Sequence, residues 1–205
     1  MVTFSNLHLG HYYVKETNAP DGYLLNAKEF DANIKYKDQT TKVIYLDVNN
    51  VIDEEPTGTI SIIKKDSETG STPQGDAELK GAVYEVFAAE DIYNKARTKK
   101  YYSKGDLVAT RTMNEKGETE DIAELPLGKY IVKEKTASKG YLIDKKEYEV
   151  NVVYKDQYTK VIANKTTSNE DVKKMQLHVF KSGIKVQSGL VQGLEGAEFT
   201  IKLNS

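Results

Sequence analysis

Residues 10–44, GHYYVKETNAPDGYLLNAKEFDANIKYKDQTTKVI, recur without a gap as residues 128–162, GKYIVKEKTASKGYLIDKKEYEVNVVYKDQYTKVI. The two stretches agree at about 20 of 35 positions, which is far beyond chance for an ungapped pairing of this length. The chain is therefore a segment of a tandem array.

Weaker repeats elsewhere in the chain give the same period. The stretch TISIIKKD at 59–66 is similar to QLHVFKSG at 176–183, and ELKGAVYEV at 78–86 is similar to LEGAEFTI at 194–201. Both put the period at about 117 residues, which is the length of one domain and much longer than a solenoid repeat.

The register of the repeats divides the chain into three predicted parts. Residues 1–55 are the C-terminal part of one repeat, residues 56–172 are a complete repeat, and residues 173–205 are the N-terminal part of a further repeat. We call them the first partial repeat, the complete repeat and the last partial repeat. The complete repeat is long enough to bury its own core.

The composition argues against several classes of partner and site. With 29 basic and 31 acidic residues the formal net charge is −2, so neither nucleic acid nor a membrane surface is expected as a partner. The chain has no cysteine, and His8, His11 and His178 share no metal-ligand spacing, so no disulfide, metal or cofactor is expected. No apolar run approaches the roughly 20 residues that span a bilayer, and no basic-then-apolar leader follows Met1. The targeting and anchor segments of an exported parent are expected outside this fragment.

Alternation of apolar residues with period two predicts an all-β fold. Ile60, Ile62 and Lys64 share one face of a first strand, and Thr, Val, Ile and Tyr dominate the patterned stretches. Short strands separated by Gly, Asn and Asp turns indicate an antiparallel sandwich or barrel. Residues 89–105 are the one stretch that could carry a helical turn, and we interpret them as an exposed excursion.

A glutamate lies in phase with core residues in each copy of the repeated block. In the strand 128–135, Tyr130, Val132 and Glu134 share one face, and Glu16 has the equivalent place in the earlier copy. The pleat of a strand points such a glutamate at the core. The alternative is that this glutamate lies at the end of the strand and is solvated, since a glutamate is almost never fully buried unless it is paired.

The motifs around these residues resemble those of a known family. The stretches GKYIVKEKTASKGY at 128–141 and GHYYVKETNAPDGY at 10–23 look like the E-box of CnaB or SpaA-type domains, the prealbumin-like repeats of Gram-positive surface adhesins and pilins. The opening ISIIKKDSETG at 60–70, followed by ELKGAVYEV at 78–86, resembles the first two strands of the same family. The resemblance covers essentially the whole chain and implies antiparallel Ig-like or prealbumin-like β-sandwich repeats in tandem.

The same resemblance implies a site. In that family a lysine on the first strand and an asparagine on the last strand are joined by an isopeptide bond, which the E-box glutamate promotes. Carried over position by position, this gives Lys64 as the amine, Glu134 as the promoter and Asn169 as the partner, with Asn164 as the alternative. Burial lowers the pKa of a lysine and raises that of a glutamate, so a neutral amine can attack an amide that a neutral acid polarises.

Spacing to the next opening lysine favours one asparagine over the other. Asn50 precedes Lys64 by 14 residues and Asn169 precedes Lys181 by 12, whereas Asn164 precedes Lys181 by 17. Asn169 therefore matches the spacing of the earlier copy better.

Each partial repeat supplies only some members of such a site. The first partial repeat has Glu16 as promoter and Asn50, or its neighbour Asn49, as partner, whereas the last partial repeat has Lys181. Each would expose a sheet edge and half a core. We hypothesise that the last partial repeat of one molecule completes the first partial repeat of another, head to tail, with a bond between Lys181 and Asn50. In the alternative the pieces stay loosely ordered or pair imperfectly.

The resemblance implies a structural function. The chain would be a stalk or spacer repeat of an adhesin or pilin, secreted and anchored to the cell wall, stabilised by an autocatalytic Lys–Asn isopeptide bond, with neighbouring repeats of the same protein as partners. The alternative is an adhesin module that recognises a host or matrix protein through residues 89–105. An enzyme is not expected, because the sequence has no nucleophile elbow, no phosphate-binding Gly-rich loop and no HExxH, and isopeptide formation turns over once.

Overall fold

The chain is built from strands. The computed structural model describes residues 2–48, 51–181 and 198–202, and these contain no helix, hence none long and apolar enough to cross a membrane. The predicted all-β fold class is confirmed. The strands are β1 (Gly10–Lys15), β2 (Glu29–Ile34), β3 (Thr57–Asp66), β4 (Val83–Ala88), β5 (Ile92–Tyr93), β6 (Lys100–Tyr102), β7 (Leu107–Thr112), β8 (Ile122–Leu125), β9 (Gly128–Thr136), β10 (Glu147–Val152) and β11 (Val161–Glu170).

The chain divides into two compact units. The first is Met1–Lys173 and holds all of the strands, and the second is Lys174–Ser205. In the second unit the described residues 174–181 have no sheet partner among the described residues and are exposed to solvent.

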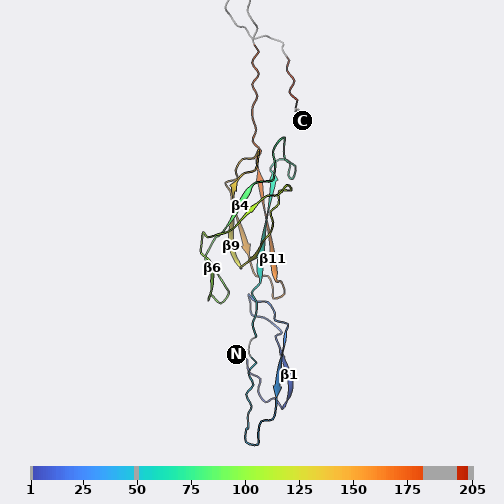
Figure 1. The fold of residues 1–205 in the computed structure, drawn as a ribbon, viewed down its shortest axis with the longest axis vertical. Helices are drawn as coiled ribbons and strands as arrows, with labels where there is room; N and C mark the ends of the chain where they lie inside the picture. The colour runs from blue at the N-terminus through green and yellow to red at the C-terminus, as the bar shows by residue number, and fades with distance from the viewer. Residues whose placement is uncertain (1, 49–50, 182–197, 203–205) are drawn as a thin grey trace, which may run out of the picture. The chain divides into compact units, whose positions relative to one another are not determined.

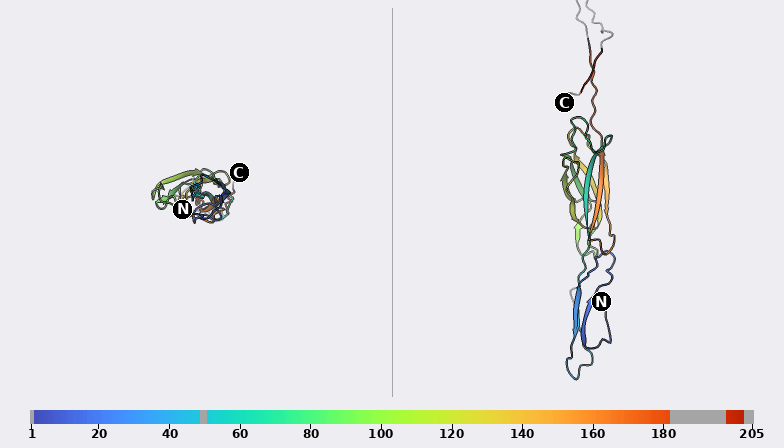
Figure 2. Two further views of the ribbon diagram at one scale, coloured as in Figure 1. Left: turned by 90° about the horizontal axis from the view of Figure 1, so that it is seen from below. Right: turned by 90° about the vertical axis from the view of Figure 1, so that its right-hand side faces the viewer.

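Two sheets form the complete repeat. One has the strand order β10-β9-β4-β7 and the other the order β11-β3-β8. The sequence predicted antiparallel pairing, and the pairs are antiparallel except for β11 with β3, which run parallel over their whole length and lie side by side in Figures 1 and 2. β10 ends near the start of β3, where Val152 packs on Gly58. The chain then crosses to the other sheet and begins β11 beside the start of β3, so the two strands run in the same direction.

Alternate residues of the facing strands fill the space between the two sheets. The predicted inward faces of the first strand and of the strand at 128–135 are confirmed, because their apolar members are buried. The buried core of these strands consists of Ile60 and Ile62 from β3, Tyr84 and Val86 from β4, Tyr130 and Val132 from β9, and Val150 and Val152 from β10.

Residues 89–105 form a β-hairpin and not a helical turn. β5 pairs with β6, and Ile92 is buried in the core of the complete repeat although most of the stretch is exposed. At its tip the backbone N–H of Lys95 donates to Glu55 Oε1 at 2.9 Å, and Lys95 Nζ lies 3.2 Å from Asp21 Oδ2. The excursion therefore contacts the first partial repeat.

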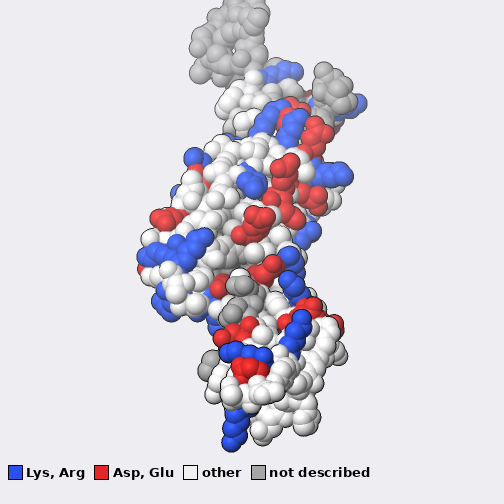
Figure 3. All heavy atoms as spheres, turned by 60° about the horizontal axis from the view of Figure 1, so that its bottom comes forward, with Lys and Arg blue, Asp and Glu red and all other residues white. Residues whose placement is uncertain are grey.

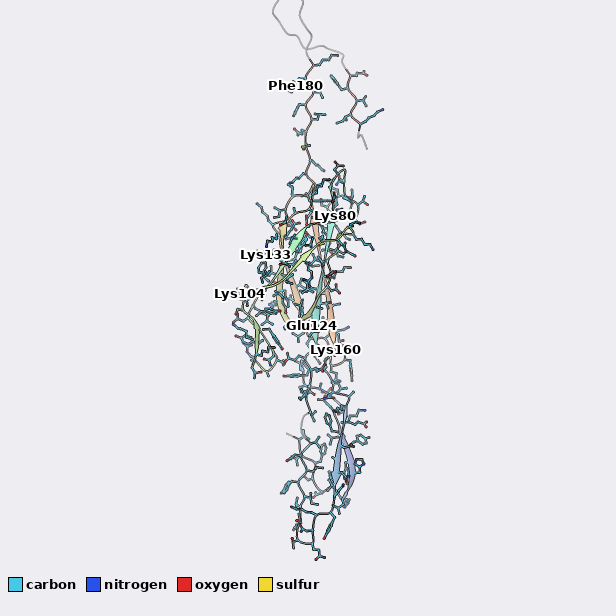
Figure 4. All side chains as sticks on the ribbon, viewed as in Figure 1. Lys80, Lys104, Glu124, Lys133, Lys160 and Phe180 are labelled. Atoms are coloured by element: carbon cyan, nitrogen blue, oxygen red, sulfur yellow. The ribbon has the colours of Figure 1, made fainter. Side chains whose placement is uncertain are left out.

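The first partial repeat holds one hairpin, in which β1 and β2 pair antiparallel. The loop before β11 contacts it: Gln157 accepts hydrogen bonds from the backbone N–H groups of Ala19, at 2.7 Å, and Leu25, at 2.9 Å. Lys160, labelled in Figure 4 at this end of the complete repeat, lies 3.5 Å from Glu54. On the face drawn in Figure 3, basic and acidic side chains are interspersed.

The contact between Gly58 and Val152 yields a stability prediction. A Cβ at Gly58 would lie 2.3 Å from Val152 Cγ1, so Gly58→Ala should lower the free energy of unfolding by about 1–3 kcal/mol through overpacking. In a Val152→Ala background the same change should cost less, because the clashing methyl groups are gone. Urea unfolding of the two single variants and the double variant measures this coupling, and an equal cost of Gly58→Ala in both backgrounds would contradict it.

Candidate functional site

Three charged side chains meet inside the complete repeat. Lys64 comes from β3, Glu134 from β9 and Glu170 from β11, and their side chains are 0%, 0% and 1% exposed. Each follows apolar or small residues at period two, so the pleat that buries the core also turns these side chains inward. The first and the last strand of the repeat and the E-box strand thus converge on one cluster.

The Lys64 amine lies between the two carboxylates. Its Nζ is 3.5 Å from Glu134 Oε1 and in direct contact with Glu170 Oε2. The ring of Tyr141 covers it, with the centroid 4.6 Å from Nζ. One amine therefore faces two carboxyl groups and an aromatic ring, in a place that water does not reach.

Hydrogen bonds orient both carboxylates. Glu134 Oε2 accepts the backbone N–H of Asp144 at 2.7 Å. Glu170 Oε1 accepts the Tyr84 hydroxyl at 2.5 Å, and the hydroxyl of Ser168 lies 3.0 Å from the same oxygen. Each carboxylate thus has one oxygen held by the protein and the other turned to the amine.

A second carboxylate network backs the cluster. Asp144 Oδ2 accepts the Tyr148 hydroxyl at 2.6 Å and lies 3.0 Å from Ser168 Oγ. Because Ser168 has a single hydroxyl proton, it can donate to Asp144 or to Glu170 at one time. Tyr141 in turn donates its hydroxyl to Asp66 at 2.9 Å, which fixes the ring over the amine.

Burial favours the neutral forms of the amine and of the promoter. Desolvation lowers the pKa of Lys64, although the nearby Glu134 charge acts against this. Desolvation also raises the pKa of Glu134, against its hydrogen bond from Asp144 and the charge of Lys64. An unprotonated amine beside a protonated acid is the state that acyl transfer requires.

The structure brings together two of the three predicted members of this site. Lys64 and Glu134 are in contact, but Asn169 is exposed and pairs in register with Lys65 on the outer face of the sheet. Glu170 lies against the amine where the sequence predicted an asparagine. The physical reason is the pleat: in the parallel ladder residues 168 and 170 face inward, and residue 169 faces outward.

Asn164 and Glu16 do not lie at this cluster. Asn164 pairs in register with Ile60, four residues before Lys64, and its Nδ2 donates to the Thr59 carbonyl at 3.4 Å. Asn49 and Asn50 lie outside the described residues. Glu16 Oε2 accepts the backbone N–H of Asn26 at 2.8 Å, in the first partial repeat.

Lys181 is described and exposed in the second compact unit.

Sequence reasoning missed Glu170, Tyr84 and Ser168. The alternation of Ser168 and Glu170 was the available signal, but the strand around them is too poor in apolar residues to show which face is inward. In the described part of the chain no group of three His, Cys, Asp or Glu side chains is arranged to hold a metal ion.

Comparison with known proteins identifies similar domains. The family model described as SpaA, a prealbumin-like fold domain, matches residues 1–49 and 58–167. The search of curated proteins found no match.

Solved structures similar to the chain come from Gram-positive bacteria. The Bacillus anthracis TIE protein is 26% identical over 80% of this chain and 25% of its own, with a TM-score of 0.49. The group B streptococcus pilus 2b backbone protein is 15% identical over 78% of this chain and 53% of its own, with a TM-score of 0.42. BcpA, the major pilin subunit of Bacillus cereus, is 18% identical over 58% of this chain and 31% of its own, with a TM-score of 0.38. The chain thus spans between a quarter and about half of the length of these proteins.

Removing the amine should leave two buried carboxylates without a counter-charge. Lys64→Met is expected to lower the free energy of unfolding by about 3–5 kcal/mol near neutral pH. Without the lysine, the pKa of Glu134, which burial raises, exceeds its unfolded value, so the variant should be more stable at about pH 5 than at about pH 8. Urea unfolding at both pH values measures this.

Lys65→Met is the matched control, since Lys65 is exposed on the opposite face of the same strand. It should change the stability by less than about 0.5 kcal/mol. Equal stability of the two variants would contradict the buried cluster.

Proposed function

Since the chain belongs to the SpaA family of prealbumin-like fold domains, we propose that it is a structural spacer of a Gram-positive surface protein, closed in its complete repeat by an amide bond between Lys64 and Glu170. The observation that carries the proposal is the buried amine between Glu134 and Glu170, where the first and the last strand of the repeat end together. The chain would act outside the cell as part of an adhesin or pilus stalk, in contact with neighbouring repeats.

The reaction condenses the amine with a carboxylic acid. A proton of the Lys64 ammonium first passes to Glu170 Oε2, with which it is in contact, so that a neutral amine faces a carboxylic acid. The nitrogen then attacks Cδ of Glu170, and a C–N bond forms while the bond from Cδ to Oε2 breaks. The protonated Glu134 gives its proton to the departing oxygen, which leaves as water, and takes a proton back from the amine nitrogen. The net products are one amide and one water, and Glu134 is unchanged.

The side chains around the reacting atoms support these roles. Tyr84 and Ser168 hold Glu170 Oε1, where negative charge develops during the attack, so Oε2 at the amine is the oxygen that departs. Because Lys64 Nζ is held in contact with Glu170 Oε2, the two reacting groups do not have to find each other by diffusion. A dry core also keeps water from reversing the reaction.

The position of the bond suits a chain under tension. Because β3 and β11 are parallel neighbours, the chain enters the repeat at the start of one strand and leaves it at the end of the other. A force applied to the two ends of the repeat is transmitted along β3 to Lys64 and through the amide to Glu170. The residues between Lys64 and Glu170 in the sequence do not bear it. The bond closes a loop of about 100 residues, which by analogy with disulfides stabilises the fold by about 4–5 kcal/mol.

The excursion of residues 89–105 favours the spacer over a ligand-binding module. Its Lys95 contacts Glu55 and Asp21 of the first partial repeat, so the tip of the hairpin supports the junction between consecutive repeats. A loop used in this way has less surface for a host or matrix protein.

The intact mass of the purified chain tests the proposed bond. We expect a mass one water below that of the sequence, and the deficit should vanish in Glu170→Ala and in Lys64→Met. Glu170→Gln should restore a bond at the cost of one ammonia in place of one water, because an amide then supplies the leaving group. Glu134→Gln should slow or abolish bond formation, since it cannot move the protons.

Asn169→Ala is the matched control, as this neighbouring side chain is exposed. It should leave the deficit of one water intact. A deficit of one ammonia that disappears in Asn169→Ala would overturn the assignment of Glu170 and establish a Lys64–Asn169 bond.

A further inference from the structure

The β-hairpin of residues 92–104, which we call the basic hairpin, concentrates positive charge. It contains no acidic side chain and five basic ones, which are Lys95, Arg97, Lys99, Lys100 and Lys104. The rest of the chain holds 24 basic and 31 acidic residues, so the net charge of −2 is the sum of a basic hairpin and an otherwise acidic chain. A local excess of one sign attracts ions of the other sign, whatever the net charge of the whole.

Two tyrosine rings hold three of these cations. The guanidinium carbon of Arg97 lies 4.5 Å from the ring centroid of Tyr93, and Lys100 Nζ lies 5.4 Å from the same centroid. Lys99 Nζ lies 4.7 Å from the ring centroid of Tyr101. A cation–π contact fixes the place of a charge and leaves its hydrogen-bond donors available to a ligand.

The turn of the hairpin holds the backbone that carries these side chains. The backbone N–H of Asn94 donates to the Lys99 carbonyl at 2.9 Å, and that of Lys99 donates to Asn94 Oδ1 at 2.8 Å. Arg97, at φ 55°, has the left-handed conformation that residues other than glycine seldom adopt, and its N–H donates to the Asn94 carbonyl at 2.9 Å. The cations are thus ordered before a ligand arrives, and binding costs little further ordering.

Only two of the five cations have an acidic partner among the residues that the structure describes. Lys95 lies 3.2 Å from an aspartate of the first partial repeat, and Lys100 lies 2.7 Å from Asp91. The other three are exposed and form no ion pair within the described ranges; they are Arg97, Lys99 and Lys104. The hairpin therefore keeps three positive charges that the protein itself does not neutralise.

These three charges are spread along the hairpin. Arg97 lies in the turn, whereas Lys104, labelled in Figure 4, follows β6 at the other end, where its backbone N–H donates to Asp91 at 2.9 Å. β6, which lies between Lys99 and Lys104, by itself covers about 10 Å. A single small anion cannot reach both ends of the hairpin, but a linear polymer with several anionic groups can.

Hydroxyl groups alternate with the three charges. Thr98 lies between the first two of them in the sequence, and its Oγ1 accepts a hydrogen bond from Asn94 Nδ2 at 2.9 Å. Ser103 precedes the third, and its Oγ accepts one from Lys100 Nζ at 3.2 Å. Each hydroxyl keeps its own proton to donate. This pattern suits a polysaccharide, in which sugar oxygens lie between the anionic groups.

The hairpin lacks the features of a nucleic-acid or a membrane site. Proteins hold single strands by stacking bases on aromatic rings, but cations of the hairpin already engage the rings of Tyr93 and Tyr101. A membrane surface is bound by exposed apolar side chains that enter the bilayer, whereas Ile92 is buried and Ala96 is small. The charge of the hairpin thus fits an anionic polysaccharide better.

We propose that the basic hairpin binds a sulfated polysaccharide, whose sulfate groups pair with Arg97, Lys99 and Lys104. The hydroxyl groups between these cations donate to sugar oxygens. Lys95 stays at the contact with the first partial repeat, so binding and spacing use different side chains of one hairpin. The site lies apart from the Lys64 cluster, and it holds or fails independently of the proposed amide.

Titration of a fluorescent heparin-derived octasaccharide with the full chain, followed by anisotropy, tests the proposal. The wild-type chain should bind, and added salt should weaken the binding because salt screens exposed charges. The variant with Arg97→Gln, Lys99→Gln and Lys104→Gln should bind at least roughly tenfold more weakly and respond less to salt. Since the three side chains are exposed, this variant should fold as the wild type does, which circular dichroism verifies.

A matched variant removes the same charge outside the hairpin. Lys116→Gln, Lys145→Gln and Lys165→Gln together change three exposed lysines of the complete repeat. They should leave the affinity within about twofold of the wild type, because distant exposed charges are screened. An equal loss of affinity in the two triple variants would show a response to net charge alone and would overturn the proposal.

Two further ligands test which anion is recognised. Desulfated heparin keeps the carboxylates and the sugar rings, and it should bind at least roughly tenfold more weakly than the sulfated octasaccharide. Polyphosphate of similar charge should also bind more weakly, because it offers no sugar oxygens to the hydroxyl groups. Failure of the sulfated octasaccharide to bind, or tighter binding of either of the other two ligands, would overturn the proposal.

Discussion

The burial of one ammonium group between two carboxylates is the constraint on which the complete repeat depends. Three ionisable groups taken out of water are tolerated only if all three side chains meet. They come from the first strand, the E-box strand and the last strand, so the requirement sets the registers of these strands at once. A slip of β3 by one residue would exchange the two faces of the strand and turn Ile60, Ile62 and Lys64 away from the core.

The local part of this arrangement is predictable from the sequence. Period-two alternation places Lys64 and Glu134 on inward faces, because each follows a clear series of apolar residues. The last strand has no such series, since Asn, Lys, Thr and Ser occupy most of ANKTTSNE, and its inward face is decided by a parallel ladder with β3 far away in the chain. Glu170 was missed for that reason, and Asn169 was predicted in its place. The hairpin at 89–105 was missed similarly, because Ile92 is its only fully buried apolar residue.

The two copies of the repeated block separate what is local in the site from what is not. The bond from Asn26 N–H to Glu16 and that from Asp144 N–H to Glu134 have nearly the same length, although only the second glutamate has a lysine beside it. The segment from the acceptor to the donor, which follows ten positions later, is therefore sufficient to orient the carboxylate. Lys64 therefore meets a glutamate that its own loop already positions, and little rearrangement is needed when the strands come together.

The energetics of the cluster favour the proposed amide over a lasting ion pair. Apolar residues of similar volume often stabilise a core as well as a buried ion pair does, so the pair of Lys64 with Glu170 is a weak source of stability. In the proposed reaction the amine and the Glu170 carboxyl group become a neutral amide, to which Tyr84 can donate its hydrogen bond. Glu134 is then left as a carboxylic acid with a raised pKa, which needs no counter-charge. On this proposal the unfavourable burial of charge is confined to the precursor, and its release favours the bond between the first and the last strand.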